Sequence, residues 1–309
     1  MPDAPLREVS LNVTAKCAGR CVYCPVPACA PPADPPQESL AGIVTQAAAL
    51  GARRLCLTGG EPFTAPALTA LLAAARAHDL DVVVCTSGAG VTRESIARAV
   101  QAAGRARALQ VCLSLDTIDE AVAARLGRPA VSVALSALEA LTATGWPVIP
   151  SVNLVLTRVN AAGASEVAAL CGRRGVGFGV QLLSERLPGG RRVPEGLAIS
   201  PDDPLVCSLT DDLESLSRHG LRVTNSPSYL AAASARAERR ACASHTDRLC
   251  VDVDLRAHTC WLLPPIGALG DQTVAAVWRS PAAAQSRAMM LSGSCPECTL
   301  RCFHDGDAP

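Results

Sequence analysis

Short apolar segments alternate with longer amphipathic segments through the first two thirds of the chain. The short segments are rich in Val and Leu, as strands buried on both faces of a sheet are, and they predict strands over Glu8–Val13, Arg54–Leu57, Asp81–Thr86, Leu109–Leu115, Val148–Leu156 and Val176–Leu183. The longer segments predict helices over Ser39–Leu50, Ala65–His78, Arg93–Ala103, Val131–Thr144 and Ala164–Arg173. Strands and helices that alternate in this order favour a parallel sheet with right-handed crossovers.

Six strand–helix units are too few for the eight-fold closed barrel, so we expect an α/β fold with an open, partial (β/α)6 barrel. The alternation ends near residue 184. Ser200–His219 predicts one more helix, with Ser200 as the N-cap and Pro201 at the first helical position. From residue 242 onwards the chain holds six cysteines. We therefore expect the barrel over residues 1–200 and a small, cysteine-rich α+β domain over residues 201–309.

Composition narrows the classes of partner. The 309 residues are 49% apolar, carry no net charge and include only 3% aromatic residues. Nucleic-acid binding needs positive charge, often with stacking rings, so we expect no nucleic-acid partner. No apolar run is long enough to span a membrane, and no secretion signal is visible. Fifteen cysteines then indicate metal ligands and buried thiols in a reducing cytoplasm.

Three of the cysteines directly follow the first predicted strand. Cys17, Cys21 and Cys24 have the spacing C-x3-C-x2-C, with Tyr23 before the third. A [4Fe–4S] cluster has four irons that thiolates normally hold. A loop with three thiolates therefore leaves one iron open for another ligand, as catalytic metal sites do. A zinc loop is the alternative for this spacing.

With this motif the chain resembles the radical S-adenosylmethionine (SAM) superfamily. The resemblance implies that Cys17, Cys21 and Cys24 hold a [4Fe–4S] cluster whose open iron binds the amino and carboxylate groups of SAM. It further implies that one electron cleaves SAM to methionine and a 5'-deoxyadenosyl radical, which abstracts a hydrogen atom from a substrate. An electron donor of the flavodoxin or ferredoxin type is the implied partner.

Further segments after the predicted strands resemble the SAM-binding segments of this family. Gly59, Gly60 and Glu61 match its G-G-E-P segment, which contacts the SAM amino group. Ser87 lies in a turn that resembles the family's T-N-G turn, and Ser114 and Asp116 form a segment that resembles its S-x-D segment. Asn153 resembles a position near the adenosyl group. The alternative for each of them is ordinary polar turn chemistry. Arg125 could pair with the SAM carboxylate or be an exposed helix arginine.

A second group of cysteines resembles the auxiliary-cluster domain called SPASM or, in its shorter form, twitch. The resemblance implies one auxiliary [4Fe–4S] cluster, held by two cysteines of a hairpin and two of a C-x2-C turn, namely Cys242, Cys260, Cys295 and Cys298. Cys302 is a rival ligand, and Cys250 lies in mid-strand. The family has a glycine where this chain has Leu255. A structural zinc site is the alternative.

A fully ligated auxiliary cluster can relay an electron, which fits a net oxidation. The cysteine spacing resembles that of twitch-type dehydrogenases of the kind that oxidises a cyclitol alcohol in butirosin biosynthesis, so we expect oxidation of a sugar-like or cyclitol-like natural-product intermediate. Maturation of a ribosomal peptide, by crosslinking or epimerisation, is one alternative. A non-catalytic iron–sulfur or zinc scaffold is another, against which the intact G-G-E-P segment argues. No catalytic residue is identified, and Cys56, Cys85, Cys112 and Cys171 are expected to be core thiols.

Overall fold

Six parallel strands form the centre of the computed structural model, which describes residues 5–24, 26, 33–104, 108–143, 145–183, 185–187, 191–236, 242 and 247–292. The strands are β1 (Glu8–Asn12), β2 (Arg54–Thr58), β3 (Asp81–Thr86), β4 (Leu109–Ser114), β5 (Val148–Leu156) and β6 (Gly177–Leu182). They lie in the spatial order β6-β5-β4-β3-β2-β1, and every pair of neighbours is parallel. The partial (β/α)6 barrel predicted from the sequence is confirmed, with each strand within one residue of its expected bounds.

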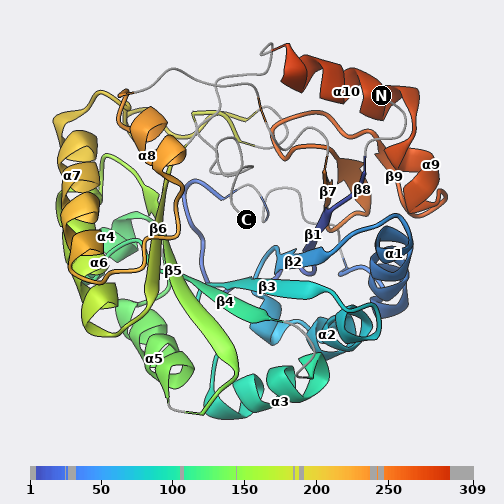
Figure 1. Ribbon diagram of the computed structural model, residues 1–309, viewed down its shortest axis with the longest axis horizontal. Helices are drawn as coiled ribbons and strands as arrows, with labels where there is room; N and C mark the ends of the chain where they lie inside the picture. Colours follow the sequence, from blue (N-terminus) through green and yellow to red (C-terminus); the bar gives the residue numbers. More distant parts are fainter. Residues whose placement is uncertain are drawn as a thin grey trace.

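Helices cover the outer face of the curved sheet (Figure 1). Along the barrel they are α1 (Gln37–Ala49), α2 (Leu68–Ala77), α3 (Arg93–Ala103), α4 (Glu120–Arg125), α5 (Val131–Thr142), α6 (Ala164–Arg173) and α7 (Pro204–Arg218). The predictions of α3 and α6 match residue for residue. The helix expected from Ala65 begins at Leu68 instead, because a short 3-10 helix over Pro62–Thr64 precedes it. Helix α4 was not predicted.

The expected start of α7 at Ser200 is wrong. Asp203 is the N-cap, and its carboxylate accepts a hydrogen bond from the Leu205 N–H at 3.0 Å. Asp203-Pro204 repeats the cap-then-proline order of Ser200-Pro201 three residues later. A helix starting at Pro201 would place the Pro204 ring against a carbonyl of the preceding turn, so the second pair sets the boundary.

Alternate residues of the strands face opposite sides of the sheet. Outward residues such as Leu57, Val84 and Leu113 are fully buried beneath the helices. The expectation of core thiols is confirmed for Cys171 on α6, which is fully buried. It is wrong for the strand thiols Cys56, Cys85 and Cys112, which are only half-buried and lie on the inner, concave face. Strands that are apolar on one face and hold small thiols on the other look uniformly apolar in sequence.

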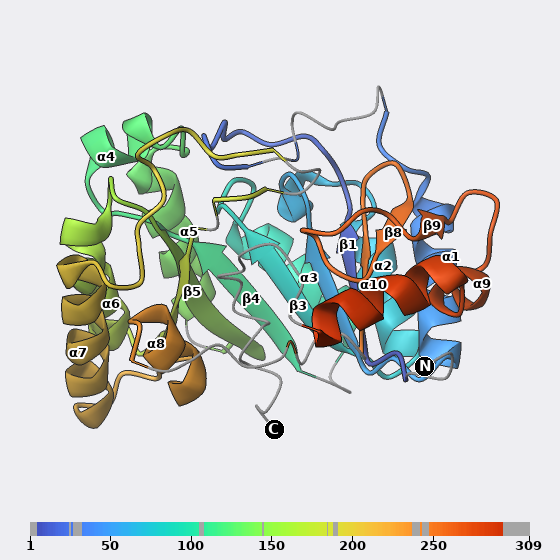
Figure 2. The ribbon, with the colours of Figure 1, turned by 90° about the horizontal axis from the view of Figure 1, so that it is seen from above.

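The C-terminal hairpin extends the barrel sheet. Strand β7 (Arg248–Val251) pairs in parallel with β1, and β8 (Arg256–His258) and β9 (Gly267–Ala268) follow in antiparallel order. Helices α9 (Val274–Trp278) and α10 (Pro281–Leu291) lie beside this end of the sheet (Figure 2). The resulting sheet has nine strands within the described residues.

The segment after residue 200 packs into the barrel as well. Val206 and Leu209 of α7 and Tyr229 of α8 (Pro227–Ala233) share one apolar core with β5 and β6. Asn225 covers the free edge of β6, since its amide accepts from the Val180 N–H at 2.7 Å and donates to the Val180 carbonyl at 2.8 Å. The division of the chain at residue 200 stays a prediction.

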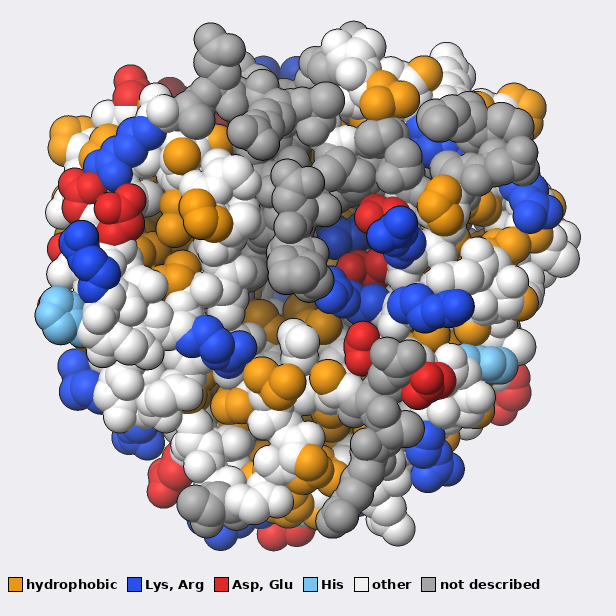
Figure 3. Space-filling model, viewed as in Figure 1, with side chains coloured by type: hydrophobic (Ala, Val, Ile, Leu, Met, Phe, Trp, Pro, Cys, Tyr) orange, Lys and Arg blue, Asp and Glu red, His pale blue; other side chains and the backbone are white. Residues whose placement is uncertain are grey.

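Basic and acidic side chains are interspersed on the face seen in Figure 3, so this face carries no large patch of one charge. This distribution agrees with the formal net charge of zero. In the part of the chain that the structure describes, no helix combines the length and the apolar character that a bilayer crossing requires.

Candidate functional site

The loop with Cys17, Cys21 and Cys24 lies between two other loops at the carboxyl ends of the strands. On one side the Glu61 N–H donates to the Lys16 carbonyl at 2.8 Å, and the Gly60 N–H donates to the Thr14 carbonyl at 2.6 Å. On the other side the Arg20 N–H donates to the Gly127 carbonyl at 2.8 Å. Backbone hydrogen bonds therefore join the cysteine loop both to the G-G-E-P segment after β2 and to the segment after α4.

Two glycines make these approaches possible. A Cβ at Gly60 would lie 2.1 Å from the Lys16 carbonyl oxygen. Gly127 has a φ of +67°, and a Cβ there would lie 2.3 Å from the Arg20 carbonyl oxygen. Both distances fall far inside van der Waals contact with backbone, so only glycine fits at either position.

The three thiols of this loop are half-buried. Burial raises the pKa of the Cys24 thiol to about 11, and it also raises the pKa of Cys21, where the nearby Arg128 acts in the opposite direction. Among the described residues no three Cys, His or acidic side chains converge on one point as ligands of a single metal ion. A cube makes a different demand, because each thiolate binds its own iron. Three separate thiols on one loop, with an N–H donor to one sulfur, fit such a cluster.

The Glu61 carboxylate is fully buried and has donors on both oxygens. Oε1 accepts from the Phe63 N–H at 3.1 Å and from Thr86 Oγ1 at 2.6 Å. Oε2 accepts from the Ser87 N–H at 2.8 Å and from Ser87 Oγ at 2.5 Å. The side chain is thus occupied within the protein, and its visible function is to join the loop after β2 to the end of β3. The expected acceptor for the SAM ammonium would have to come from the backbone of this segment.

Asp116 is likewise buried and saturated. Its Oδ1 accepts from the Val155 N–H at 2.9 Å, and its Oδ2 accepts from the Tyr23 hydroxyl and pairs with Arg128 Nε at 3.4 Å. Burial raises the pKa of Tyr23 well above its ordinary value, and the adjacent Asp116 charge adds to this effect. The aromatic residue of the cysteine motif is therefore tied to the end of β4.

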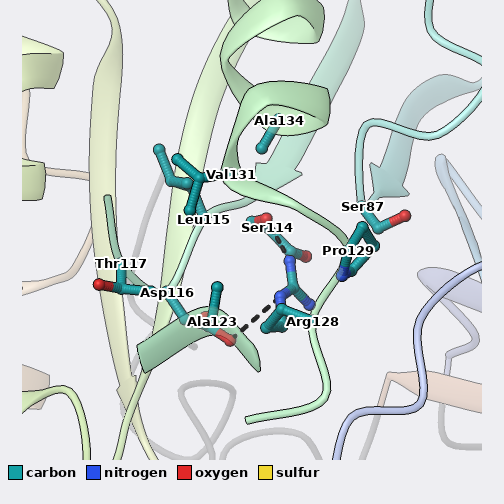
Figure 4. A pocket seen from close by; sticks show the side chains of 10 residues that line it. All are labelled: Ser87, Ser114, Leu115, Asp116, Thr117, Ala123, Arg128, Pro129, Val131 and Ala134. Carbon is teal, nitrogen blue, oxygen red and sulfur yellow. Dashed lines mark hydrogen bonds and ion pairs between the residues drawn. The ribbon is translucent and has the colours of Figure 1, made fainter. Parts of the chain in front are cut away.

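Arg128 is a residue of this site that the sequence analysis did not single out. Figure 4 shows its guanidinium between Asp116 and Ser114, with interactions to both. A cavity of about 10 Å3 brings Ser87 and the same three residues together. Arg125, which the sequence offered as a partner for a carboxylate, is exposed on the last turn of α4. The Gly-Arg-Pro run after an S-x-D segment is a signal that could have pointed to Arg128.

Ser114 and Asn153 remain available to a ligand. They face each other across β4 and β5 in the parallel register. Both are half-buried, and neither side chain has a hydrogen-bond partner within the described ranges. Of the SAM contacts expected from the sequence, these two keep free polar groups at the carboxyl ends of the strands.

The hairpin brings together the described half of the second cysteine group. Cys242 is buried against Leu263 and Met290, and Cys260 packs on the same small cluster. Cys295 and Cys298, with the rival Cys302, lie outside the described residues. Cys250 is buried on β7, beside Ser10 of β1.

The hairpin turn forms although the family's glycine is absent. Leu255 adopts a φ of +61°, the left-handed conformation that glycine would take at no steric cost. Asp252 fixes the hairpin to β1, since it accepts from Asn12 Nδ2 at 3.0 Å and also contacts His258 Nε2 at 3.0 Å. The strand that leads to Cys17 is therefore linked directly to the hairpin that leads to Cys260.

Comparisons with known proteins identify the family of the chain. The family described as the Radical SAM superfamily matches residues 11–170. A GTP 3',8-cyclase from Parasynechococcus marenigrum (strain WH8102) is 37% identical over 139 residues, 40% of this chain and 38% of that protein. A PqqA peptide cyclase from Streptomyces rochei is 36% identical over 153 residues, 48% of this chain and 40% of that protein. The chain thus spans about two fifths of the length of these curated relatives.

Solved structures show the fold at low sequence identity. Streptococcus suis SuiB bound to the precursor peptide SuiA superposes with a TM-score of 0.75 at 16% identity, over 92% of this chain and 67% of that one. BtrN in complex with AdoMet and 2-DOIA gives a TM-score of 0.53 at 12% identity, over 94% of this chain and 88% of that one. SuiB and BtrN are SPASM- or twitch-type enzymes. The family match covers more than half of the residues, and the chain belongs to the radical SAM superfamily.

Proposed function

We propose that Cys17, Cys21 and Cys24 hold the [4Fe–4S] cluster that binds SAM in this chain. The observation that carries the proposal is the position of their loop, which is bonded both to the G-G-E-P segment and to the segment after α4. When bound, the cluster supplies the electron that cleaves SAM into methionine and a 5'-deoxyadenosyl radical, which abstracts a hydrogen atom from the substrate. A flavodoxin or ferredoxin is the proposed electron donor.

The chain's own residues would position SAM in two ways. The backbone of Gly59 and Gly60 and the free side chains of Ser114 and Asn153 would contact it directly. The buried side chains among the predicted contacts, which are Glu61, Ser87 and Asp116, would hold those contacts in place through hydrogen bonds inside the protein. This division follows from which polar atoms already have partners.

We also propose one auxiliary cluster, held by Cys242 and Cys260 together with Cys295 and Cys298. The position of Cys242 and Cys260 in one small apolar cluster supports it. Removing one hydrogen atom leaves a substrate radical, and a net oxidation needs an acceptor for a second electron. The auxiliary cluster, when bound by these cysteines, would supply that acceptor. The Asn12–Asp252 bond keeps the hairpin in a fixed position relative to β1.

The inner face of the barrel favours an uncharged, hydroxylated substrate. After the first inward residue of each strand, the described strands β2–β6 present only Cys, Ser, Thr, Asn, Gln, Gly and Val on this face. Charged inward residues, such as Arg54 and Asp81, lie at the opposite, amino ends. A neutral polyol finds hydrogen-bond partners on such a surface, whereas a triphosphate finds no cation there. We therefore propose oxidation of a sugar-like or cyclitol-like small molecule.

A peptide substrate is the second candidate. It rests on the sequence similarity to PqqA peptide cyclases, which extends over 48% of this chain in the Streptomyces rochei protein. A backbone amide segment is also uncharged, so the inner face would accept it. The genes beside this one separate the two candidates, because a peptide substrate requires an encoded precursor.

The test is anaerobic reconstitution with iron and sulfide, followed by reduction and an assay for 5'-deoxyadenosine. We expect about eight irons per chain for two clusters, and about four in a Cys17→Ala, Cys21→Ala, Cys24→Ala variant that forms no 5'-deoxyadenosine. Cys207→Ala, which changes a half-buried thiol on α7, is the matched control and should behave as wild type. Wild-type protein that binds iron but never consumes SAM would refute the proposal. Neutral polyols and the neighbouring precursor peptide, if one is encoded, are then compared as stimulants of SAM cleavage.

A further inference from the structure

Arg128 lies at the contact between the cysteine loop and the end of β4, and nothing in the proposed reaction uses it so far. Its Nη1 donates to Cys21 Sγ at 3.6 Å. Its Nη2 donates to the Ser114 carbonyl, and its Nε pairs with the Asp116 carboxylate. The side chain is only 11% exposed. A cation on a chain segment 107 residues away in sequence is thus held against one of the three proposed cluster ligands.

The surroundings fix this guanidinium in one orientation. Asp116 cannot move with it, because its other oxygen is bound to the Val155 N–H and its Oδ2 also accepts from the Tyr23 hydroxyl. A planar guanidinium that donates in three directions to fixed acceptors has no freedom to swing into solvent. The Cys21 sulfur therefore keeps both a hydrogen-bond donor and a positive charge beside it.

A fixed cation and an N–H···S bond favour the state with more negative charge on the cluster. Reduction adds one electron, so these interactions stabilise the reduced form more than the oxidised form. The Asp116 charge offsets part of this effect, but it lies on the Nε side, while Nη1 is the atom that faces the sulfur. The expected net result is a less negative reduction potential.

We propose that Arg128 raises the reduction potential of the cluster held by Cys17, Cys21 and Cys24 through its contact with the Cys21 sulfur. The inference rests on the proposed function of those cysteines. Arg128 acts through a ligand and does not touch the reacting atoms, so it is a positioning residue. Its effect is on how readily the electron that cleaves SAM can be placed on the cluster.

The test is a reductive titration of reconstituted wild type, Arg128→Gln and Arg128→Lys, followed by electron paramagnetic resonance and normalised to loaded iron. The relevant signal is the one that changes when SAM is added, because only this cluster has an open iron. At a fixed ambient potential we expect about tenfold less reduced cluster in Arg128→Gln, equivalent to 59 mV for one electron. Arg128→Lys keeps the charge but cannot donate in three directions, so we expect a smaller shift in the same direction.

Arg125→Gln is the matched control, since it removes the same charge three residues earlier from an exposed side chain. It should titrate as wild type. The inference would be overturned if an Arg128 variant that loads its cluster had the same reduction potential as wild type. It would also be overturned if the potential of that variant shifted to less negative values. Loss of the cluster from both Arg128 variants in folded protein would also overturn it, since Arg128 would then only brace the loop. Failure of the proposed function looks different, because wild type itself would show no SAM-sensitive signal.

Discussion

The replacement of Glu61 by Gln separates two functions of the G-G-E-P segment. In the structure the carboxylate joins the loop after β2 to the end of β3, with four donors and no exposed surface. If the carboxylate instead served as the acceptor for the SAM ammonium, its removal would weaken SAM binding and leave the stability of the SAM-free protein unchanged. Glu61→Gln keeps the shape of the side chain and removes the charge and one acceptor oxygen.

The magnitude follows from the donors. Whichever side the new amide NH2 takes, it faces one hydroxyl, which can rotate to accept, and one backbone N–H, either of Phe63 or of Ser87, which cannot. A buried N–H without an acceptor costs about 1–3 kcal/mol, and each bond that loses its charge assistance costs about 1 kcal/mol more. A neutral amide costs less to bury than a charged carboxylate, which offsets part of this loss of stability. The expected loss in the free energy of unfolding is about 3 kcal/mol, a large share of the ~5–15 kcal/mol typical of a domain.

Urea unfolding of the cluster-free protein, followed by circular dichroism, measures this loss. Thr86→Val removes one donor of the four and also the acceptor of the Gly88 N–H, so it should cost about 2–3 kcal/mol. Glu139→Gln, on the exposed face of α5, is the matched control and should change stability by less than ~0.5 kcal/mol. SAM binding to reconstituted protein is measured in parallel. A Glu61→Gln protein as stable as wild type, but with weakened SAM binding, would refute the internal role and assign the carboxylate to SAM.

Three further predictions concern the cysteine loop, a buried thiol and the sheet edge. Gly60→Ala should lose cluster iron, because its Cβ would lie 2.1 Å from a carbonyl oxygen of the cysteine loop, while Gly42→Ala, with no atom within 4 Å, should load normally in an iron assay. Burial raises the pKa of Cys171 to about 12, so above pH 9 the unfolded chain loses a proton that the folded chain keeps, and stability should fall by up to ~1.4 kcal/mol per pH unit. Denaturation of Cys171→Ala between pH 9 and 12 should show a shallower slope, and an equal slope contradicts the assignment. Asn225→Ala should destabilise by about 2–4 kcal/mol and raise light scattering, because it uncovers both backbone groups of Val180, whereas unchanged stability would show that water replaces the amide.

Local patterns in the sequence predicted the elements but not their distant pairings. The barrel strands were predictable because a parallel strand buried on both sides is a short, continuous apolar run. The parallel pairing of β7 with β1 was not, since Val9 and Leu249 are 240 residues apart and nothing local specifies their alignment. The sequence therefore indicates a domain boundary at residue 200 but not the pairing that joins this hairpin to the barrel sheet.

The positions of the motif residues could be predicted from the sequence, but the contacts of their side chains could not. Gly60 and Cys21 lie where the family pattern puts them, because their spacing to the strand ends is local. The direction of the Glu61 side chain depends on Ser87, which reaches it from the next strand, and no spacing rule encodes that contact. Arg128 could not be identified for the same reason, because its contact with Cys21 joins two loops that are 107 residues apart in the sequence.

Both buried acids of the site act as links between strand ends. Glu61 joins the loop after β2 to the end of β3. Asp116 joins the end of β4 to β5 and, through Tyr23, to the cysteine loop after β1. Because each carboxylate already has donors on both oxygens, neither contributes an unpaired negative charge to a ligand. In the proposed site, the groups that would contact SAM are the neutral side chains of Ser114 and Asn153, backbone atoms and the cluster. We therefore expect salt to weaken SAM binding little, and a steep decrease in affinity with ionic strength would show that one of these carboxylates is freed when SAM binds.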